Sequence, residues 1–244
     1  MPTAVHAPLD TPKPLGENLW IVDSGPLMAL GVVPVPIRMT VARLGNGDLW
    51  LHSPTRLTEP LFAALAEIGP IRHIVAPNIV HWTLLRDWQR RCPEAITWAA
   101  PGLRERGQVR RSGVRLDTDL GSRPPEAWAG EIDQVVVPGG LGFHEVAFFH
   151  RPSRTTILTD LIQNFDPNGL PPPVAKLARV AGIAAPEGGT APHLRAVLLL
   201  RREAAAAAVS RILDWRPEQV IFAHGQPYRE DAAAKLRRAM RWLV

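Results

Sequence analysis

The stretch Ile74-Val75-Ala76-Pro77-Asn78-Ile79-Val80-His81 joins a predicted strand to a predicted helix, and this junction decides the fold. The short apolar run from His73 to Ala76 predicts a buried strand that ends at a proline. Apolar residues then recur on one side of the segment from about Val80 to Arg91, at the spacing of a helix. The stretch therefore predicts a β-α unit with a loop at the C-terminal end of its strand.

The order of strand and then helix repeats along the chain and predicts an α/β fold with a largely buried sheet. Near the start, Gly45-Asn46-Gly47 separates two alternating runs, which is typical of a hairpin because Asn-Gly tolerates positive φ. A helix is predicted from Thr58, its N-cap, to Ile68. The other predicted elements are the hairpin strands Arg38 to Leu44 and Asp48 to His52, a later hairpin of Glu145 to His150 with Thr155 to Asp160, the strands Ile96 to Ala99, Ile132 to Pro138 and Gln219 to Ala223, and the helices His193 to Asp214 and Glu230 to Leu243.

The N-terminal part differs in composition from the rest of the chain. Residues 1–36 are rich in proline and predict an arm packed on the core, with one short extended piece from Asn18 to Asp23. A chain of 244 residues, 46% of them hydrophobic, can bury one sizeable core. Residues 37–244 are therefore expected to form a single domain.

Composition narrows the class of partner and the compartment. The chain carries 28 Lys and Arg against 23 Asp and Glu, and its densest basic stretch, Arg104 to Arg115, has no interleaved aromatic residues, so a nucleic-acid partner is not expected. No apolar stretch approaches the ~18 residues that cross a membrane, and the N-terminus lacks a basic start followed by an apolar run. Cys92 is the lone cysteine, which excludes an intrachain disulfide and a thiolate cluster. We expect a cytoplasmic protein that acts on or binds a small molecule.

Three polar residues follow predicted buried strands, at the place where α/β folds expose reactive groups. They are His81, Asp160 and His224. Each has a structural explanation when taken singly, since Asp160 can cap a following turn and a lone histidine at a strand end is commonly only hydrogen-bonded. Together, two imidazoles and one carboxylate are a sufficient ligand set for a zinc-like or iron-like ion with positions left for water.

The order of these elements resembles the metallo-β-lactamase superfamily over about residues 38 to 228. The resemblance implies a four-layer αββα sandwich. In that family a His-x-His-x-Asp-His loop follows the strand, and here Ala76, Asn78 and Val80 replace its first three residues while His81 matches its last. The later hairpin ends in a bridging carboxylate, which Asp160 matches.

The resemblance also includes the last histidine ligand of the family. From the matched ligands it implies which of the family's two metal sites is retained. A histidine beside glycine after a late strand corresponds to His224. The retained set is that of the second metal site, which implies one divalent transition metal, with zinc expected and iron or manganese as alternatives. Leu49 to Pro54, Ala76 to Asn78 and Phe148 to Thr155 are similar to a divergent DUF4336-like branch, a domain of unknown function.

Other residues near the inferred pocket have predicted roles. The family has one further histidine ligand before the later hairpin, and His144 lies close enough to replace it although it is out of register. Glu145 and Asp160 are the candidates for proton transfer. His52 and Asn78 are expected to orient ligands from outside the metal's coordination shell. His150, at the turn of the later hairpin, is expected to be a surface or turn residue rather than a ligand.

Three functions are compatible with this reduced site. The first is a metal-dependent hydrolase that uses metal-activated water on an ester, amide or phosphoester. The second is a non-catalytic descendant that binds a ligand or partner through the old pocket, because a fold does not carry a function unless its site survives. The third is oxidoreductase chemistry at non-haem iron, which two histidines and a carboxylate also suit.

Overall fold

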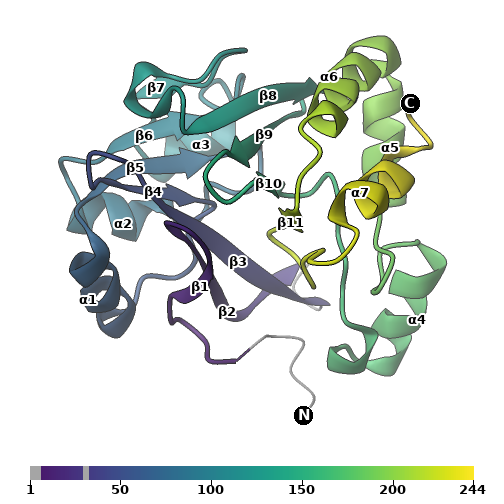
Figure 1. The fold of residues 1–244 in the computed structure, drawn as a ribbon, viewed down its shortest axis with the longest axis horizontal. Helices are drawn as coiled ribbons and strands as arrows, with labels where there is room; N and C mark the ends of the chain where they lie inside the picture. The colour runs from purple at the N-terminus through teal and green to yellow at the C-terminus, as the bar shows by residue number, and fades with distance from the viewer. Residues whose placement is uncertain (1–6, 30–32) are drawn as a thin grey trace.

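The computed structural model describes residues 7–29 and 33–244, so residues 1–6 and 30–32 of the predicted arm lie outside the described part of the chain. Two sheets lie face to face in the middle of the molecule, and helices cover both outer faces (Figure 1). The early helices lie on one side of the sheets, and the helices of the C-terminal part lie on the other. This is the predicted four-layer αββα arrangement.

The first sheet has seven strands that follow one another in chain order. Its first four strands are antiparallel neighbours, and β4 to β7 are parallel. The mixed sheet thus begins as a meander and continues as β-α units. The strands are β1 (Lys13–Gly16), β2 (Leu19–Ala29), β3 (Val33–Arg43), β4 (Leu49–His52), β5 (Ile71–Ala76), β6 (Ile96–Ala99) and β7 (Thr118–Asp119).

The second sheet has four strands in the order β11-β10-β9-β8. The pair β9 and β10 forms the later hairpin, with Thr155 opposite His150, as predicted. Strand β11 pairs with β10 in parallel, so the segments that follow these two strands leave the same edge of the sheet. The strands are β8 (Ile132–Pro138), β9 (His144–His150), β10 (Thr155–Ile157) and β11 (Gln219–Ile221).

Three apolar clusters fill the spaces between the four layers. Trp50 and Phe148 lie in the cluster between the two sheets, with their rings edge to face at 5.0 Å. A second cluster joins the first sheet to α1 (Glu59–Ile68), α2 (Leu85–Arg91) and α3 (Gly107–Ser112), and a third joins the second sheet to α5 (Pro192–Leu199), α6 (Arg202–Asp214) and α7 (Ala232–Met240). The remaining helices are α4 (Pro172–Val180), η1 (Glu126–Trp128) and η2 (Pro167–Gly169).

Local chemistry explains where several elements begin. The Thr58 side chain accepts a hydrogen bond from the backbone N–H of Leu61 and caps α1, as predicted. Gly47 has a φ of +90° in the turn between β3 and β4, which is the conformation that the Asn-Gly pair predicted. The helix after β5 begins at Leu85 rather than at Val80, because the preceding residues form turns.

The helix predicted from His193 to Asp214 is interrupted. The carbonyl of Val197 accepts from the N–H of Gly140 at 2.8 Å, and the N–H of Arg201 donates to Leu198 at 3.0 Å. A continuous helix would join the Val197 carbonyl to the Arg201 N–H. The hydrogen bond from Gly140 therefore takes the place of the helical bond from Arg201 to Val197, at the point where the segment divides into α5 and α6.

The proline-rich segment is part of the first sheet rather than an arm with one short strand. Strand β2 extends from Leu19 to Ala29, well beyond the predicted piece Asn18 to Asp23, and pairs with β3. The predicted boundary between residues 36 and 37 falls inside β3. A register shift between Ser24 and Leu27 marks an irregularity in this hairpin.

His150 lies in the core, which corrects its predicted place at the surface. It ends β9 fully buried, and its Nδ1 lies 2.7 Å from Ser153 Oγ. Burial lowers the pKa of His150 to about 4. The strand pairing of β9 holds the ring inside the sandwich, whereas the turn begins only at the next residue.

This buried histidine predicts a pH-dependent stability. Because the unfolded chain binds a proton at His150 near pH 6.5 and the folded chain only near pH 4, the stabilisation is complete above pH 6.5 and is lost as the pH falls toward 4. The pKa difference of about 2.5 corresponds to a loss of about 3 kcal/mol at acidic pH. Urea unfolding of wild type and His150→Gln between pH 4 and 8 should show a shallower slope for the variant, and equal slopes would contradict the assignment.

Candidate metal centre

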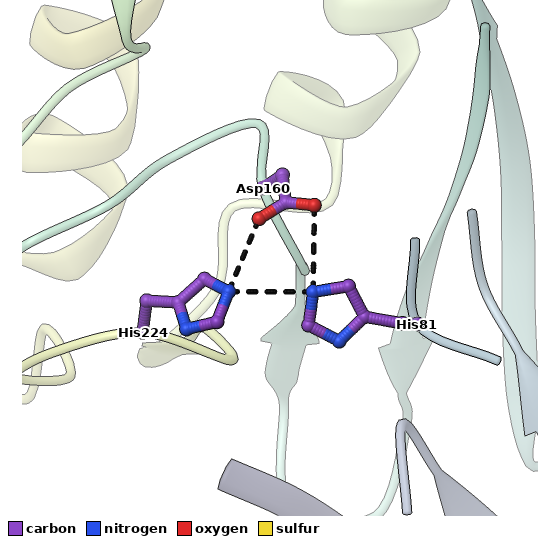
Figure 2. A group of neighbouring side chains, drawn as sticks. All are labelled: His81, Asp160 and His224. Carbon is purple, nitrogen blue, oxygen red and sulfur yellow. Dashed lines mark hydrogen bonds and ion pairs between the residues drawn. The ribbon is translucent and has the colours of Figure 1, made fainter. Parts of the chain in front are cut away.

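Three segments that follow strands bring the predicted ligands together (Figure 2). His81 lies in the turn after β5, Asp160 follows β10 and His224 follows β11. Of the described residues, these three form a group in which one ligand atom from each lies within 4.8 Å of the others. The site is therefore built across the junction of the two sheets.

The separations within this group fit a cation. The Nε2 atoms of His81 and His224 are 3.3 Å apart, and the Asp160 carboxylate places one oxygen 3.4 Å from His81 Nε2 and the other 3.2 Å from His224 Nε2. Ligand bonds of about 2.0 Å in a tetrahedral zinc site separate the ligand atoms by about 3.3 Å. The donor set and its spacing thus suit a divalent transition metal.

Hydrogen bonds at the far side of each ring fix both imidazoles. His224 Nδ1 donates to the carbonyl of Pro36 at 2.7 Å, so Nε2 is the ring nitrogen that faces the centre and can offer a lone pair to a metal. His81 Nδ1 lies 2.6 Å from Ser53 Oγ. Such outer contacts are the usual means of orienting histidine ligands. The carbonyl of Pro36 comes from β3, so the N-terminal hairpin directly supports the site.

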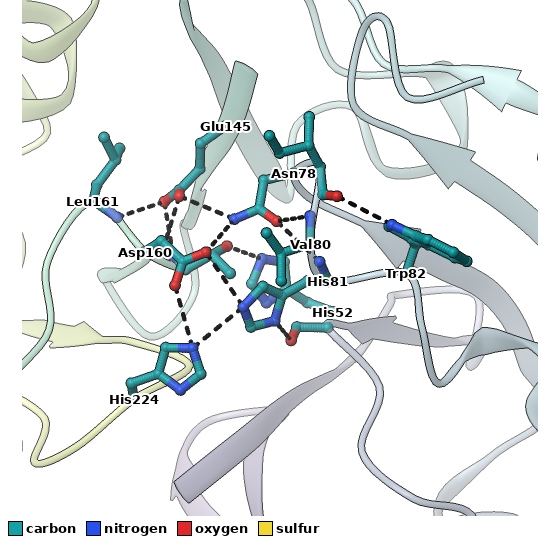
Figure 3. A network of polar contacts seen from close by, with 12 residues as sticks. His52, Asn78, Val80, His81, Trp82, Glu145, Asp160, Leu161 and His224 are labelled. Atoms are coloured by element: carbon teal, nitrogen blue, oxygen red, sulfur yellow. Dashed lines mark hydrogen bonds and ion pairs between the residues drawn. The ribbon is translucent and has the colours of Figure 1, made fainter. Parts of the chain in front are cut away.

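Asn78 connects two of the candidate ligands (Figure 3). Its Nδ2 donates to Asp160 Oδ2 at 2.7 Å, and its Oδ1 accepts from the backbone N–H groups of Val80 and His81 at 2.9 and 3.0 Å. These last bonds satisfy two backbone N–H groups of the turn that carries His81, and they hold that turn in place. Asn78 therefore positions both residues.

The Glu145 carboxylate faces the backbone of the turn that carries Asp160. It accepts hydrogen bonds from the N–H groups of Thr159, Asp160 and Leu161 at 2.8, 2.8 and 3.2 Å. The side chain is fully buried, and burial together with the charge of Asp160 raises the pKa of Glu145 to about 7. The contacts favour a positioning role for Glu145 over its predicted role in proton transfer.

Mutual electrostatic interactions shift the pKa values of the ligands. Burial alone would raise the pKa of Asp160, but the two imidazoles outweigh it and hold that pKa well below its usual range. Burial likewise opposes protonation of His224, whereas its hydrogen bond to Asp160 raises the pKa of the ring. Asp160 is therefore an ionised carboxylate, which is the form that binds a metal.

The structure does not bring His144 or His52 into the ligand group. His144 begins β9 near Gly102, and its buried Nδ1 has no hydrogen-bonding partner among the described residues. His52 lies 3.4 Å from Thr159 Oγ1 and stacks on Trp50 at 5.6 Å. Burial lowers the pKa of His52 to about 3, so the ring is neutral.

Arg38 supports the site although its sequence context did not point to it. Its guanidinium donates to the carbonyls of Phe222 and Gly225 at 3.2 and 2.6 Å, on either side of His224. An ion pair with Asp23 at 2.7 Å holds the same group inside the protein. A charged residue between the apolar Ile37 and Met39 in a predicted strand was the available signal.

A cleft of about 400 Å³ opens onto the three candidate ligands. The β2–β3 hairpin and the turn after β5 contribute to its walls. His193, which had no sequence context that favoured chemistry, also lines it from the start of α5. Chain folding alone brings this histidine to the site, about 30 residues after Asp160 in the sequence.

Comparison with solved structures shows the metallo-β-lactamase fold. The chain is similar to TMB-1 (TM-score 0.64, 10% identity, 99% of each chain covered) and to the metallo-β-lactamase FIM-1 from Pseudomonas aeruginosa in its mono-zinc form (0.61, 15%, 96% of each). It is also similar to the metal-soaked Flv1 flavodiiron core from Synechocystis (0.64, 9%), covering 98% of this chain and 60% of that one.

Within this fold class, the chain belongs to the DUF4336 family, a domain of unknown function, whose model matches residues 17–187. His224 lies beyond the matched range, and His81 and Asp160 lie inside it. No curated protein matches the sequence. In the described part of the chain no helix has the length and apolar character needed to span a membrane.

Proposed function

We propose that the protein is a metal-dependent hydrolase with a mononuclear site at His81, Asp160 and His224. The observation that carries the proposal is the convergence of ligand atoms from three residues that line a cleft, with the two imidazole nitrogens 3.3 Å apart and each within 3.4 Å of an Asp160 oxygen. A divalent transition metal bound there would acidify water and polarise a carbonyl or phosphoryl group. Zinc suits the nitrogen and oxygen donors, and iron or manganese is an alternative.

The chain's own residues prepare this site for an ion. The carbonyl of Pro36 and the hydroxyl of Ser53 orient the two rings, and Asn78 holds Asp160 between them. Asp160 stays ionised, so it offers negative charge rather than a proton. Because Val80 stands where the related motif has its acidic residue, proton transfer relies on water and on His193, the remaining titratable side chain among the described residues that line the cleft.

A non-catalytic binding protein is the second candidate. It is favoured by the replacement of three motif residues with Ala76, Asn78 and Val80, of which Asn78 is engaged in four hydrogen bonds within the protein. In this case the cleft would bind a ligand without turnover. The two functions differ in whether a bound metal is accompanied by hydrolysis.

Metal content, measured together with metal-dependent hydrolysis, decides between these functions. Wild-type protein purified without chelator or added zinc is expected to carry about one transition metal ion per chain by mass spectrometry of the metal, since three ligands suffice for one site. Chelator treatment should remove both the metal and any hydrolytic activity, and readdition should restore them. Protein that neither carries nor rebinds a stoichiometric transition metal would exclude the hydrolase.

A further inference from the structure

We infer that the cleft accepts an uncharged carboxylic ester with an apolar acyl chain, rather than a phosphoester or a substrate with an anionic group. This inference rests on the proposed hydrolytic function and names its substrate class. The side chains on the walls of the cleft, away from the candidate ligands, carry it.

The walls present apolar side chains to solvent. Met28 on the β2–β3 hairpin is 55% exposed, and Val80 on the turn after β5 is 56% exposed. The half-buried Leu27 and Val35 and the buried Ile37, on the same hairpin, also line the cleft. Exposed apolar side chains that gather at a cleft are typical of a ligand-binding surface.

Lysine and arginine side chains are absent from the walls as far as the structure describes them. Among the described residues that line the cleft, the acidic one is Asp160. Arg56 lies beside β2, but its guanidinium donates to the carbonyls of Gly25 and Pro26 at 2.8 and 3.1 Å and does not line the cleft. Arg38 is buried on its ion pair with Asp23.

This charge distribution selects among the hydrolytic reactions. Phosphoryl transfer needs cationic side chains or a second metal ion to spread the charge of its transition state, and neither is provided by the walls. Amide hydrolysis needs an acid to protonate the leaving amine, and among the described residues that line the cleft only His193 lies outside the proposed metal site and could act as one. An ester with an alcohol of low pKa needs neither.

The reaction balances with water as the sole co-reactant. The oxygen of water forms a bond to the acyl carbon, and the bond between that carbon and the alkoxy oxygen breaks. One proton of the water goes to the departing alkoxide, and the other leaves the new carboxylic acid for the solvent. No oxidant or reductant is involved.

A panel of p-nitrophenyl substrates tests the substrate class on zinc-loaded and manganese-loaded protein. We expect kcat/KM for the octanoate to exceed that for the acetate at least about tenfold, because each methylene of the acyl chain that is buried against an apolar wall stabilises the bound ester. The pentanoate should be preferred over the monoester of succinic acid, which has a similar length and a negative charge. Bis(p-nitrophenyl) phosphate and octanoyl p-nitroanilide should be turned over more slowly than the octanoate.

Met28→Lys places a cation on the wall at an exposed position, so the fold should tolerate it. In this variant the kcat/KM for the octanoate is expected to fall relative to that for the acetate. The kcat/KM for the succinate monoester is expected to rise relative to that for the pentanoate. Leu177→Lys is the matched control, because Leu177 is 66% exposed on α4 and does not line the cleft. The control should keep the wild-type ratios.

Calorimetric binding of 2-decanone, a neutral ketone that is not hydrolysed, separates this inference from the proposed function. Binding that Met28→Lys weakens, in protein that hydrolyses none of the panel, would uphold the apolar cleft and overturn the hydrolase. Metal-dependent turnover that prefers the phosphodiester or the succinate monoester would uphold the hydrolase and overturn the apolar ester. Absence of both binding and turnover would overturn both.

Discussion

Replacing His224 with alanine is expected to weaken the binding of a divalent transition metal by at least about a hundredfold. Loss of an outer-shell partner of a ligand typically costs 10–100-fold in metal affinity, and loss of a ligand itself should exceed that. Asp160→Asn should have a comparable effect, because the carboxylate lies within 3.4 Å of both imidazoles and supplies the negative charge of the site. Competition with a chromogenic chelator at fixed pH measures these affinities.

His144→Ala is the matched control for this experiment. His144 has the same side-chain chemistry as His224 and is half-buried, but the described structure leaves it outside the group of converging ligand atoms. We expect its metal affinity to stay within about threefold of wild type, well below the cost of losing an outer-shell partner. A loss as large as that of His224→Ala would instead make His144 a ligand. Equal affinity in wild type and His224→Ala would remove His224 from the site.

Much of the fold could be predicted because its elements follow local patterns. The Asn-Gly turn, the Thr58 cap and the apolar runs of β5, β6 and β8 depend on neighbouring residues, and the structure confirms them. Contacts over long distances in the sequence explain the errors. The break between α5 and α6 involves a hydrogen bond from Gly140, and the strand pairing of β2 with β3 extends far beyond the predicted piece.

The sequence predicted the three converging residues from their place after buried strands and from the order of a related motif. It could not place their supports. Arg38 reaches the loop of His224 across more than 180 positions in the chain, and His193 reaches the cleft through the packing of α5. Neither contact produces a pattern among neighbouring residues of the sequence, so the residues that support the site could be identified only from the folded structure.

Glu145→Ala is expected to destabilise the protein by about 3 to 6 kcal/mol. The substitution leaves the N–H groups of Thr159, Asp160 and Leu161 without their acceptor, and each unsatisfied buried donor costs about 1–3 kcal/mol. The cavity left by the side chain adds to this loss. Urea unfolding followed by far-UV circular dichroism measures the free energy of unfolding.

Glu145→Gln retains one carbonyl oxygen but turns an NH₂ group toward backbone donors, so it should recover only part of the stability. Glu67→Ala, at an exposed position on α1, is the control and should stay within about 0.5 kcal/mol of wild type. Since the three N–H groups belong to the turn that carries Asp160, the alanine variant should also lose metal affinity at temperatures where it remains folded. A stable Glu145→Ala with wild-type metal affinity would show that this turn holds its shape without the buried carboxylate, and that Glu145 does not position Asp160.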